Sequence, residues 1–179
     1  IESEYMAYDY MKAQYEQLGN AKMVEKFEIC PIRESDEMYT KYFSSSLLDT
    51  AMHELGVGTT RDMDSVISGI FFPSLRCKAY TWQERINLWR GKGLSAQFPV
   101  VNDSTHFNAF GEVPSLQIPI YFFAGKYDYT CCFDLQYEYY EQINAPIKEF
   151  YVFDNSAHSP IYEEPEEAAK FFEAILEVE

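Results

Sequence analysis

Two stretches decide the fold, Ile118-Pro119-Ile120-Tyr121-Phe122-Phe123-Ala124-Gly125-Lys126-Tyr127-Asp128 and Lys148-Glu149-Phe150-Tyr151-Val152-Phe153-Asp154-Asn155-Ser156-Ala157-His158. The apolar run 118–124, with its β-branched and aromatic residues, predicts a strand buried on both faces, and 148–153 predicts a second strand. Residues 133–143 between them predict a helix. The two strands should therefore be parallel neighbours in a right-handed βαβ unit. Pro165 then begins a closing helix that we expect to reach about Leu176.

An acid and a histidine follow these two strands. Because the carboxyl ends of adjacent parallel strands meet at one edge of a sheet, Asp128 and His158 should lie close together. A carboxylate that accepts a hydrogen bond from an imidazole fixes its tautomer and stabilises its cation, as a general base requires. Taken singly, Asp128 fits better as a turn or capping residue and His158 as a locally bonded loop histidine. Only their joint placement favours catalysis.

The last third of the chain resembles the end of an α/β-hydrolase of the type that includes proline iminopeptidases and related esterases. The matching pieces are Ile118-Pro119-Ile120, Gly125-Lys126-Tyr127-Asp128-Tyr129-Thr130, Ala145-Pro146-Ile147-Lys148, Ser156-Ala157-His158-Ser159-Pro160 and Glu163-Glu164-Pro165. The resemblance implies that Asp128 and His158 are the acid and base of a Ser-His-Asp triad that hydrolyses an ester or an amide. One departure is Cys131-Cys132, where the family usually has a proline shortly after the acid's turn.

A nucleophile is missing from the expected pattern. The family places its serine in G-x-S-x-G, upstream of an inserted lid. Ser95 lacks the second glycine and a preceding strand, Ser68 lacks the first glycine, and 44–46 is expected within a helix. The resemblance thus implies a C-terminal fragment of the fold that supplies acid, base and lid. The isolated chain should be inactive.

The first two-thirds of the chain is expected to be helical and the last third βαβα. Helices are predicted over 2–18, 21–29, 35–55, 61–72 and 81–89, with Gly91 and Gly93 ending the last, and a short one over 104–110. We assign 1–97 to the helical lid and 98–179 to the C-terminal βαβα part of the hydrolase core. Four aromatic residues of the lid are candidates to line a substrate pocket, although packing between lid helices explains them at least as well. These are Phe71, Phe72, Trp82 and Trp89.

Composition excludes several classes of function. With 14 basic and 29 acidic residues, the formal charge of −15 offers no cationic face for nucleic acid and repels an anionic membrane. No apolar run approaches the ~20 residues of a membrane span. The acidic start 1–4 is unlike a signal peptide, and the cysteines lack C-x-x-C spacing, so we expect a cytoplasmic protein with reduced thiols. No metal-binding or dinucleotide motif is found, so neither a metal nor a cofactor is predicted.

Alternative functions stay open. Two strands make a poor sheet alone because their outer edges keep unpaired backbone groups. The chain could be a non-catalytic, hydrolase-derived module whose exposed edge pairs with a second copy or another chain. A third reading keeps the fold but uses a carboxylate nucleophile. For the enzymatic reading we expect a small molecule or a short peptide as substrate, and the acidic Glu2, Glu4, Glu163 and Glu164 are compatible with a peptide amino terminus.

Overall fold

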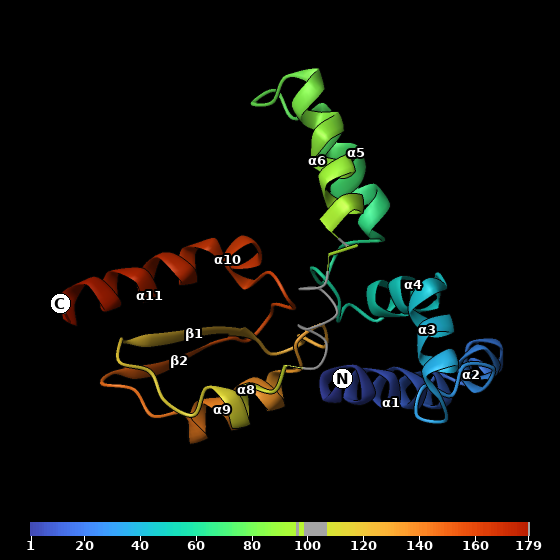
Figure 1. The fold of residues 1–179 in the computed structure, drawn as a ribbon, viewed down its shortest axis with the longest axis horizontal. Coiled ribbons are helices and arrows are strands. Elements are labelled where there is room, and N and C mark those ends of the chain that lie inside the picture. The colour runs from blue at the N-terminus through green and yellow to red at the C-terminus, as the bar shows by residue number, and fades with distance from the viewer. Residues whose placement is uncertain (96, 99–106, 179) are drawn as a thin grey trace.

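The computed structural model describes residues 1–95, 97–98 and 107–178 (Figure 1). Within these ranges the protein is helix-rich α/β, with one parallel sheet of two strands. A helical body, a projecting helical hairpin and a C-terminal βαβα unit follow one another along the chain. In the same ranges no helix combines the length and apolar character needed to cross a membrane.

The helical body contains the largest buried cluster of the protein. Its helices are α1 (Glu2–Gln17), α2 (Ala21–Glu28), α3 (Asp36–Ser44) and α4 (Leu47–Glu54). Tyr8, Phe27 and Tyr42 pack as a group of aromatic rings at its centre, with ring centroids 5.0–6.2 Å apart. The predicted helices 2–18 and 21–29 are confirmed. Asn20 caps α2 through its side-chain oxygen, which accepts the backbone N–H of Met23.

The single helix predicted over 35–55 is wrong. The chain leaves the helical conformation at Ser45, whose ψ of 164° is extended, so α3 and α4 are separate helices. The Ser45 hydroxyl donates to the carbonyl of Tyr42 and accepts the N–H of Leu47. Serine side chains can replace helical hydrogen bonds of the backbone in this way, and at Ser45 they interrupt the helix.

A hairpin formed by a π-helical turn η1 (Ile67–Phe71), α5 (Phe72–Arg76) and α6 (Trp82–Ser95) stands off the body (Figure 1). Thr81 begins α6 as predicted, through a reciprocal pair of hydrogen bonds with Glu84. Three other expectations fail. Residues 61–65 are not helical, so the helix predicted over 61–72 begins later. The helix continues past Pro73, because this residue lies in the first turn of α5, where its missing N–H is tolerated, and α6 runs through both Gly91 and Gly93.

The C-terminal unit has the predicted order. Its elements are α8 (Ala109–Glu112), β1 (Ile120–Gly125), α9 (Phe133–Gln142), β2 (Lys148–Phe153), α10 (Pro160–Glu163) and α11 (Pro165–Val178). The strands are parallel, with Ile120 opposite Lys148 and Gly125 opposite Phe153. The prediction of a βαβ unit followed by a helix is confirmed. The short helix expected over 104–110 falls partly outside the described residues, and α8 is capped by Asn108.

Aromatic side chains alternate between the two faces of the sheet. On one face Phe123 and Tyr151 contact Phe172 and Phe171 of α11, with centroids 5.0 and 4.5 Å apart. On the other face Phe150 lies against α9, and its ring centroid is 5.6 Å from that of Phe133. This alternation is the period of two expected of a strand.

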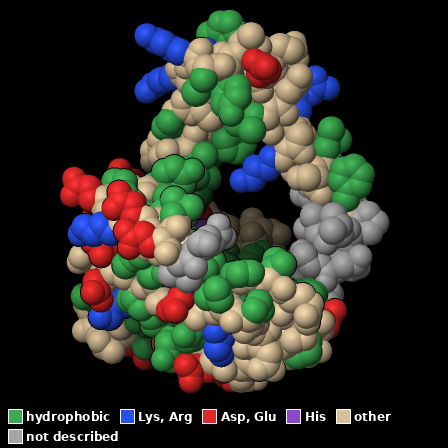
Figure 2. All heavy atoms as spheres, turned by 90° about the vertical axis from the view of Figure 1, so that its left-hand side faces the viewer, with side chains coloured by type: hydrophobic (Ala, Val, Ile, Leu, Met, Phe, Trp, Pro, Cys, Tyr) green, Lys and Arg blue, Asp and Glu red, His purple; other side chains and the backbone are tan. Residues whose placement is uncertain are grey.

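The burial predicted for the first strand is only partly found. Within β1 only Ala124 and Gly125 are buried, and the residues before them are half-buried, so burial on both faces is wrong for most of its length. The reason is that, among the described residues, the sheet has no third strand to cover the outer sides of β1 and β2. The exposed hydrophobic side chains of this unit include Ile118, Val152, Phe172 and Leu176. Figure 2 shows hydrophobic side chains on one face of the molecule.

Candidate functional site

The loops after the two strands are joined to each other by main-chain hydrogen bonds. The N–H of Lys126 donates to the carbonyl of Phe153, and the N–H of Tyr127 donates to that of Ser156, both at 3.0 Å. Gly125 allows this approach, because a Cβ placed there would lie 1.9 Å from the carbonyl oxygen of Ala157. The acid loop (125–130) and the histidine loop (154–158) therefore form one unit at the carboxyl ends of β1 and β2.

Asp128 is buried, at 4% exposure, and its carboxylate accepts four hydrogen bonds. Oδ1 accepts the N–H groups of Thr130 and Cys131, both at 2.9 Å. Oδ2 accepts Nε2 of Gln136 at 3.1 Å and Nδ1 of His158 at 3.0 Å. A carboxylate held by this many donors has one orientation, and it presents Oδ2 to the imidazole.

His158 meets Asp128 through Nδ1, and this contact assigns the tautomer of its ring. With Nδ1 carrying the proton that Asp128 accepts, Nε2 is the ring's proton acceptor. The hydrogen bond to Asp128 raises the pKa of His158 above its ordinary value, and partial burial opposes this rise. The imidazole is 41% exposed, whereas the Asp128 side chain is 5% exposed. A buried acid thus orients an accessible base, as the sequence predicted; the catalytic role of the two residues stays a prediction.

A segment from the helical body lies against both loops. This crossing segment, residues 57–61, follows Gly56, which has a φ of 64° and ends α4 with a hydrogen bond from the N–H of Val57 to the carbonyl of Met52. The carbonyl of Val57 accepts the N–H of Tyr129 at 3.2 Å, and the carbonyl of Gly58 accepts the N–H of His158 at 3.1 Å. The crossing segment therefore touches the acid loop and the histidine loop at once.

Side chains add to these main-chain contacts. The guanidinium carbon of Arg61 lies 3.5 Å from the ring centroid of Tyr127, a cation–π contact. Glu163 accepts the N–H of Arg61 at 2.6 Å and that of Ala157 at 2.9 Å. Glu164 accepts the N–H of Asn155 at 3.0 Å and the hydroxyl of Ser156 at 2.6 Å. These carboxylates hold the histidine loop from α10 and the residue after it.

Sequence reasoning missed several of these supporting residues. Gln136 lies in the first turn of α9, and its distance from Asp128 along the chain gives no sign of the contact. The crossing segment is about 70 residues away from the acid loop and about 100 from the histidine loop, so only the tertiary structure reveals these contacts. The sequence singles out Glu163 and Glu164 for their charge and as part of the family resemblance, and neither predicts a contact with the histidine loop. Their place shortly after a loop histidine was the available signal.

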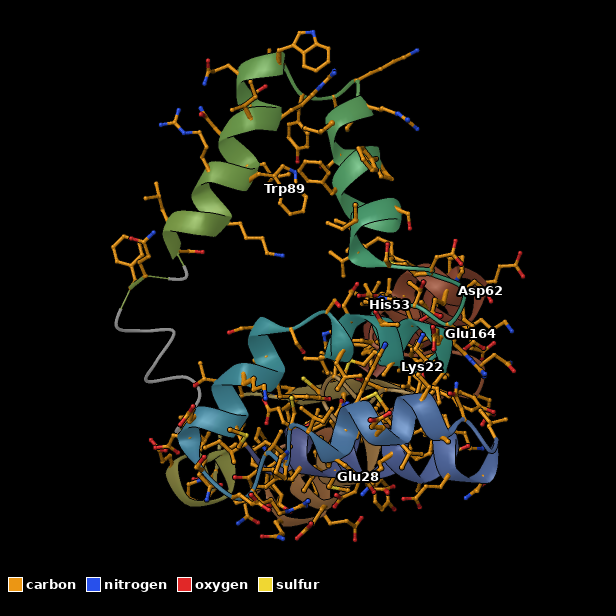
Figure 3. All side chains as sticks on the ribbon, turned by 90° about the vertical axis from the view of Figure 1, so that its right-hand side faces the viewer. Lys22, Glu28, His53, Asp62, Trp89 and Glu164 are labelled. Carbon is orange, nitrogen blue, oxygen red and sulfur yellow. The ribbon has the colours of Figure 1, made fainter. Side chains whose placement is uncertain are left out.

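The four aromatic residues predicted to line a substrate pocket lie in the hairpin, away from Asp128 and His158. Phe71, Phe72 and Trp89 cluster there, with ring centroids 5.4 Å apart for Phe71–Phe72 and 4.8 Å for Phe71–Trp89. The indole N–H of Trp89 donates to the Ser74 hydroxyl, and Figure 3 shows this residue between the two arms of the hairpin. Trp82, at the far end, is 69% exposed. The structure brings three of the four together and none of them to the histidine.

No nucleophile meets His158 within the described part of the chain. Ser95 donates to the carbonyl of Lys92, and Ser68 pairs with Ser65, so both hydroxyls are engaged in local contacts. Over the same residues no cluster of three or more His, Cys, Asp or Glu side chains has the arrangement of a metal site. Within the described residues the arrangement therefore supplies an oriented imidazole, with no nucleophilic side chain in contact with it.

Comparison with known proteins gives a partial match. A segment of 59 residues is 44% identical to the "Probable aminopeptidase YbaC" of Bacillus subtilis (strain 168). It makes up 33% of this chain and 19% of that protein, so the chain matches less than a fifth of its relative. No known protein-family profile and no solved structure match the chain. Since aminopeptidases hydrolyse peptide bonds, the similarity points to a hydrolase.

Proposed function

We propose that this chain is part of a serine-type hydrolase of the α/β-hydrolase fold, in which Asp128 is the acid and His158 the base of the triad. The observation that carries the proposal is the 3.0 Å contact between Nδ1 of His158 and Oδ2 of the buried Asp128. Residues 1–97 act as the lid, and 98–179 form the end of the core. The serine and the backbone amides for the oxyanion lie outside these 179 residues, which are the C-terminal part of the fold.

In the proposed reaction His158 accepts a proton and donates it again in each of two halves. Nε2 of His158 takes the proton of the serine hydroxyl as its oxygen bonds to the substrate carbonyl carbon, and then gives that proton to the departing amine or alcohol. In the second half a water molecule takes the place of the serine hydroxyl and gives its proton to His158, which returns it to the serine as the carboxylic acid product is released. Asp128 accepts the hydrogen bond of Nδ1 and stabilises the imidazolium that forms in each half of the reaction. The raised pKa of His158 favours that cation.

Two features support a peptide or small ester as the substrate class. The relative's name specifies an aminopeptidase, so release of an amino-terminal residue from a short peptide is the reaction we favour. The formal charge of −15 is unsuited to nucleic acid and suits a cationic peptide amino terminus. We place the reaction in the cytoplasm, in keeping with the free cysteines.

The first experiment reads the coding DNA upstream of the Ile1 codon. We expect an in-frame coding sequence for a strand followed by G-x-S-x-G. The longer protein should then release nitroaniline from aminoacyl p-nitroanilides. His158→Ala and Asp128→Asn should each lower kcat about 10⁴-fold. Glu166→Gln, on an exposed first-turn residue of α11, is the matched control and should retain activity.

Two results would contradict the proposal. One is His158-dependent turnover by the 179-residue chain itself, which would place a nucleophile within it. The other is a longer protein that keeps full activity after His158→Ala.

The open edges of the sheet favour a second candidate function. In the described ranges β1 and β2 pair only with each other, so their outer edges could add a strand from a partner or a second copy. An in-frame stop codon directly upstream of Ile1, together with a dimer in analytical ultracentrifugation, would favour this non-catalytic module. A monomer at high concentration would count against it.

A further inference from the structure

We propose that Glu163 is a positioning residue for His158, because its carboxylate clasps the histidine loop to the crossing segment. The consequence for turnover rests on the function proposed above. The geometric part of the inference concerns only how the imidazole is held over Asp128, and it can be tested without any activity.

Both oxygens of Glu163 are occupied by main-chain donors from distant parts of the chain. Oε1 accepts the N–H of Arg61 at 2.6 Å, across 102 residues, and Oε2 accepts the N–H of Ala157 at 2.9 Å. Hydrogen bonds to an ionised carboxylate are short and strong. One side chain thus ties the crossing segment to the residue directly before His158.

The tie matters because Ala157 is fully buried. If Glu163 is removed, the N–H of Ala157 is left without its acceptor in a place that water does not reach. A buried unsatisfied donor costs about 1–3 kcal/mol, so the loop is expected to shift until the N–H finds a partner. Any such shift carries the Cα of His158 with it.

The same clasp sets the position of the acid. The crossing segment accepts the N–H of His158 at Gly58 and the N–H of Tyr129 at Val57. Arg61 also lies over the ring of Tyr127. The loops that carry acid and base therefore share one support, and Glu163 closes that support on the side of the histidine.

Glu164 differs from Glu163 although it is the next residue. Its contacts stay within the histidine loop, at Asn155 and Ser156, and none reaches the crossing segment. In Figure 3 Glu164, His53 and Asp62 lie on the same side of the body, below the hairpin that carries Trp89. Substitution of Glu164 should loosen the start of the loop and leave the link to the body in place.

The two carboxylate oxygens of Glu163 already accept main-chain hydrogen bonds, and this is why we assign the residue to positioning His158 and not to binding substrate. A peptide amino terminus would have to compete with two main-chain N–H groups for them. If the substrate amine displaced these N–H groups, the histidine loop would lose its order while His158 has to act as the base. The hydrogen bonds of Glu163 and Glu164 within the protein therefore outweigh their compatibility with a peptide amino terminus.

The test measures the pKa of the His158 imidazole by NMR in the 179-residue chain. Glu163→Gln keeps the shape of the side chain but offers one acceptor in place of two. We expect the raised pKa of His158 to fall toward 6.5, because the imidazole moves away from Asp128. The control Glu166→Gln should leave it unchanged, and Glu164→Gln should have the smaller effect of the two neighbours.

This readout separates positioning from stability alone. A merely structural role would lower the melting temperature without changing the His158 pKa of the folded protein. A folded Glu163→Gln variant with an unchanged His158 pKa would overturn the proposal. Should that variant not fold, hydrogen exchange on the unchanged chain decides: the amides of Arg61 and Ala157 should show equal protection, and a rapidly exchanging Ala157 amide would refute the clasp.

Activity of the longer protein distinguishes the two proposals from each other. Glu163→Gln should lower kcat by up to about 100-fold with little change in KM, since a small misplacement of the base affects the reaction more than substrate binding. If the longer protein hydrolyses nothing but the pKa of His158 still responds to Glu163→Gln, the proposed function fails and the positioning role stands.

Discussion

The two loops after the strands and the hairpin of η1, α5 and α6 are built in opposite ways. In the loops Asp128, Ser156 and Ala157 are buried, and hydrogen bonds converge on them from α9, α10 and the helical body. In the hairpin no described residue from 67 to 95 is buried. The position of the acid and base is thus fixed by many independent contacts. The hairpin is held chiefly by contacts between its own arms.

The difference teaches where geometry is needed. A base must lie within hydrogen-bond reach of its orienting acid, and a shift of an ångström is costly. A lid can reach its working position when substrate arrives, so few fixed contacts with the rest of the chain are required. If the hairpin is a lid, its aromatic cluster should become part of a pocket only when the rest of the fold and a substrate are present.

The largest expected effect comes from adding one methyl group in each region. At Gly125 a Cβ would lie 1.9 Å from the carbonyl oxygen of Ala157, so Gly125→Ala must push the two loops apart. We expect a loss of about 4 kcal/mol or more in the free energy of unfolding, or no folding at all. At Gly93 a Cβ meets nothing within 4 Å, and Gly93→Ala within α6 should stabilise by about 0.5–1 kcal/mol.

Urea denaturation of both variants measures this pair. If Gly125→Ala proved as mild as Gly93→Ala, the close approach of the two loops would be wrong, and with it the contrast between the regions.

A pH-dependent effect comes next in size. The pKa of His158 is raised by Asp128, so this contact adds stability that is fully present below about pH 6.5 and is lost as pH rises through the folded pKa. Asp128→Asn should lower the pKa of His158 and remove that pH dependence. The difference in unfolding free energy between the two proteins should therefore be larger at pH 5.5 than at pH 8.5.

Denaturant titrations at the two pH values, with an NMR titration of the imidazole, would check this. A difference that grew toward high pH would mean that the contact does not stabilise the cation. Trp89→Ala in the hairpin is the matched control, since it should leave the titration of His158 unchanged.

The smallest effect is expected at the far end of the hairpin. Trp82 is 69% exposed, and its clearest contact is the guanidinium of Arg85, 4.6 Å from the ring centroid. Trp82→Ala should change the free energy of unfolding by no more than about 0.5 kcal/mol. If a thermal melt of Trp82→Ala showed that the free energy of unfolding falls by several kcal/mol, Trp82 would have to be packed against another part of the protein.

The parts of the fold that were predictable depend on local patterns. Residues 120–125 form the strand that the apolar run indicated, and the βαβ order placed Asp128 beside His158 because parallel strands end at one edge. The candidate pair could therefore be found from sequence. Its supports could not, since Gln136, Gly58 and Glu163 act through contacts that depend on how separate elements pack.

The errors have equally local causes. A glycine inside a helix costs only about 1 kcal/mol, so Gly91 and Gly93 did not end α6 once its arm could pack on α5. The break at Ser45 depended on a side-chain hydroxyl winning over the backbone, which the apolar stripe of 35–55 concealed. At both positions the free energies of the helical and the non-helical backbone are close, and the spacing of apolar residues does not show which one is lower.

The unpaired outer edges of the sheet have a consequence for amide protection. In a strand successive N–H groups point to opposite sides, and among the described residues β1 and β2 have a ladder partner on one side only. Deuterium uptake along each strand should consequently alternate between slow and fast with every second residue. Docking of a further strand would erase that alternation, and so a single mass-spectrometric or NMR trace could report when the sheet has been completed.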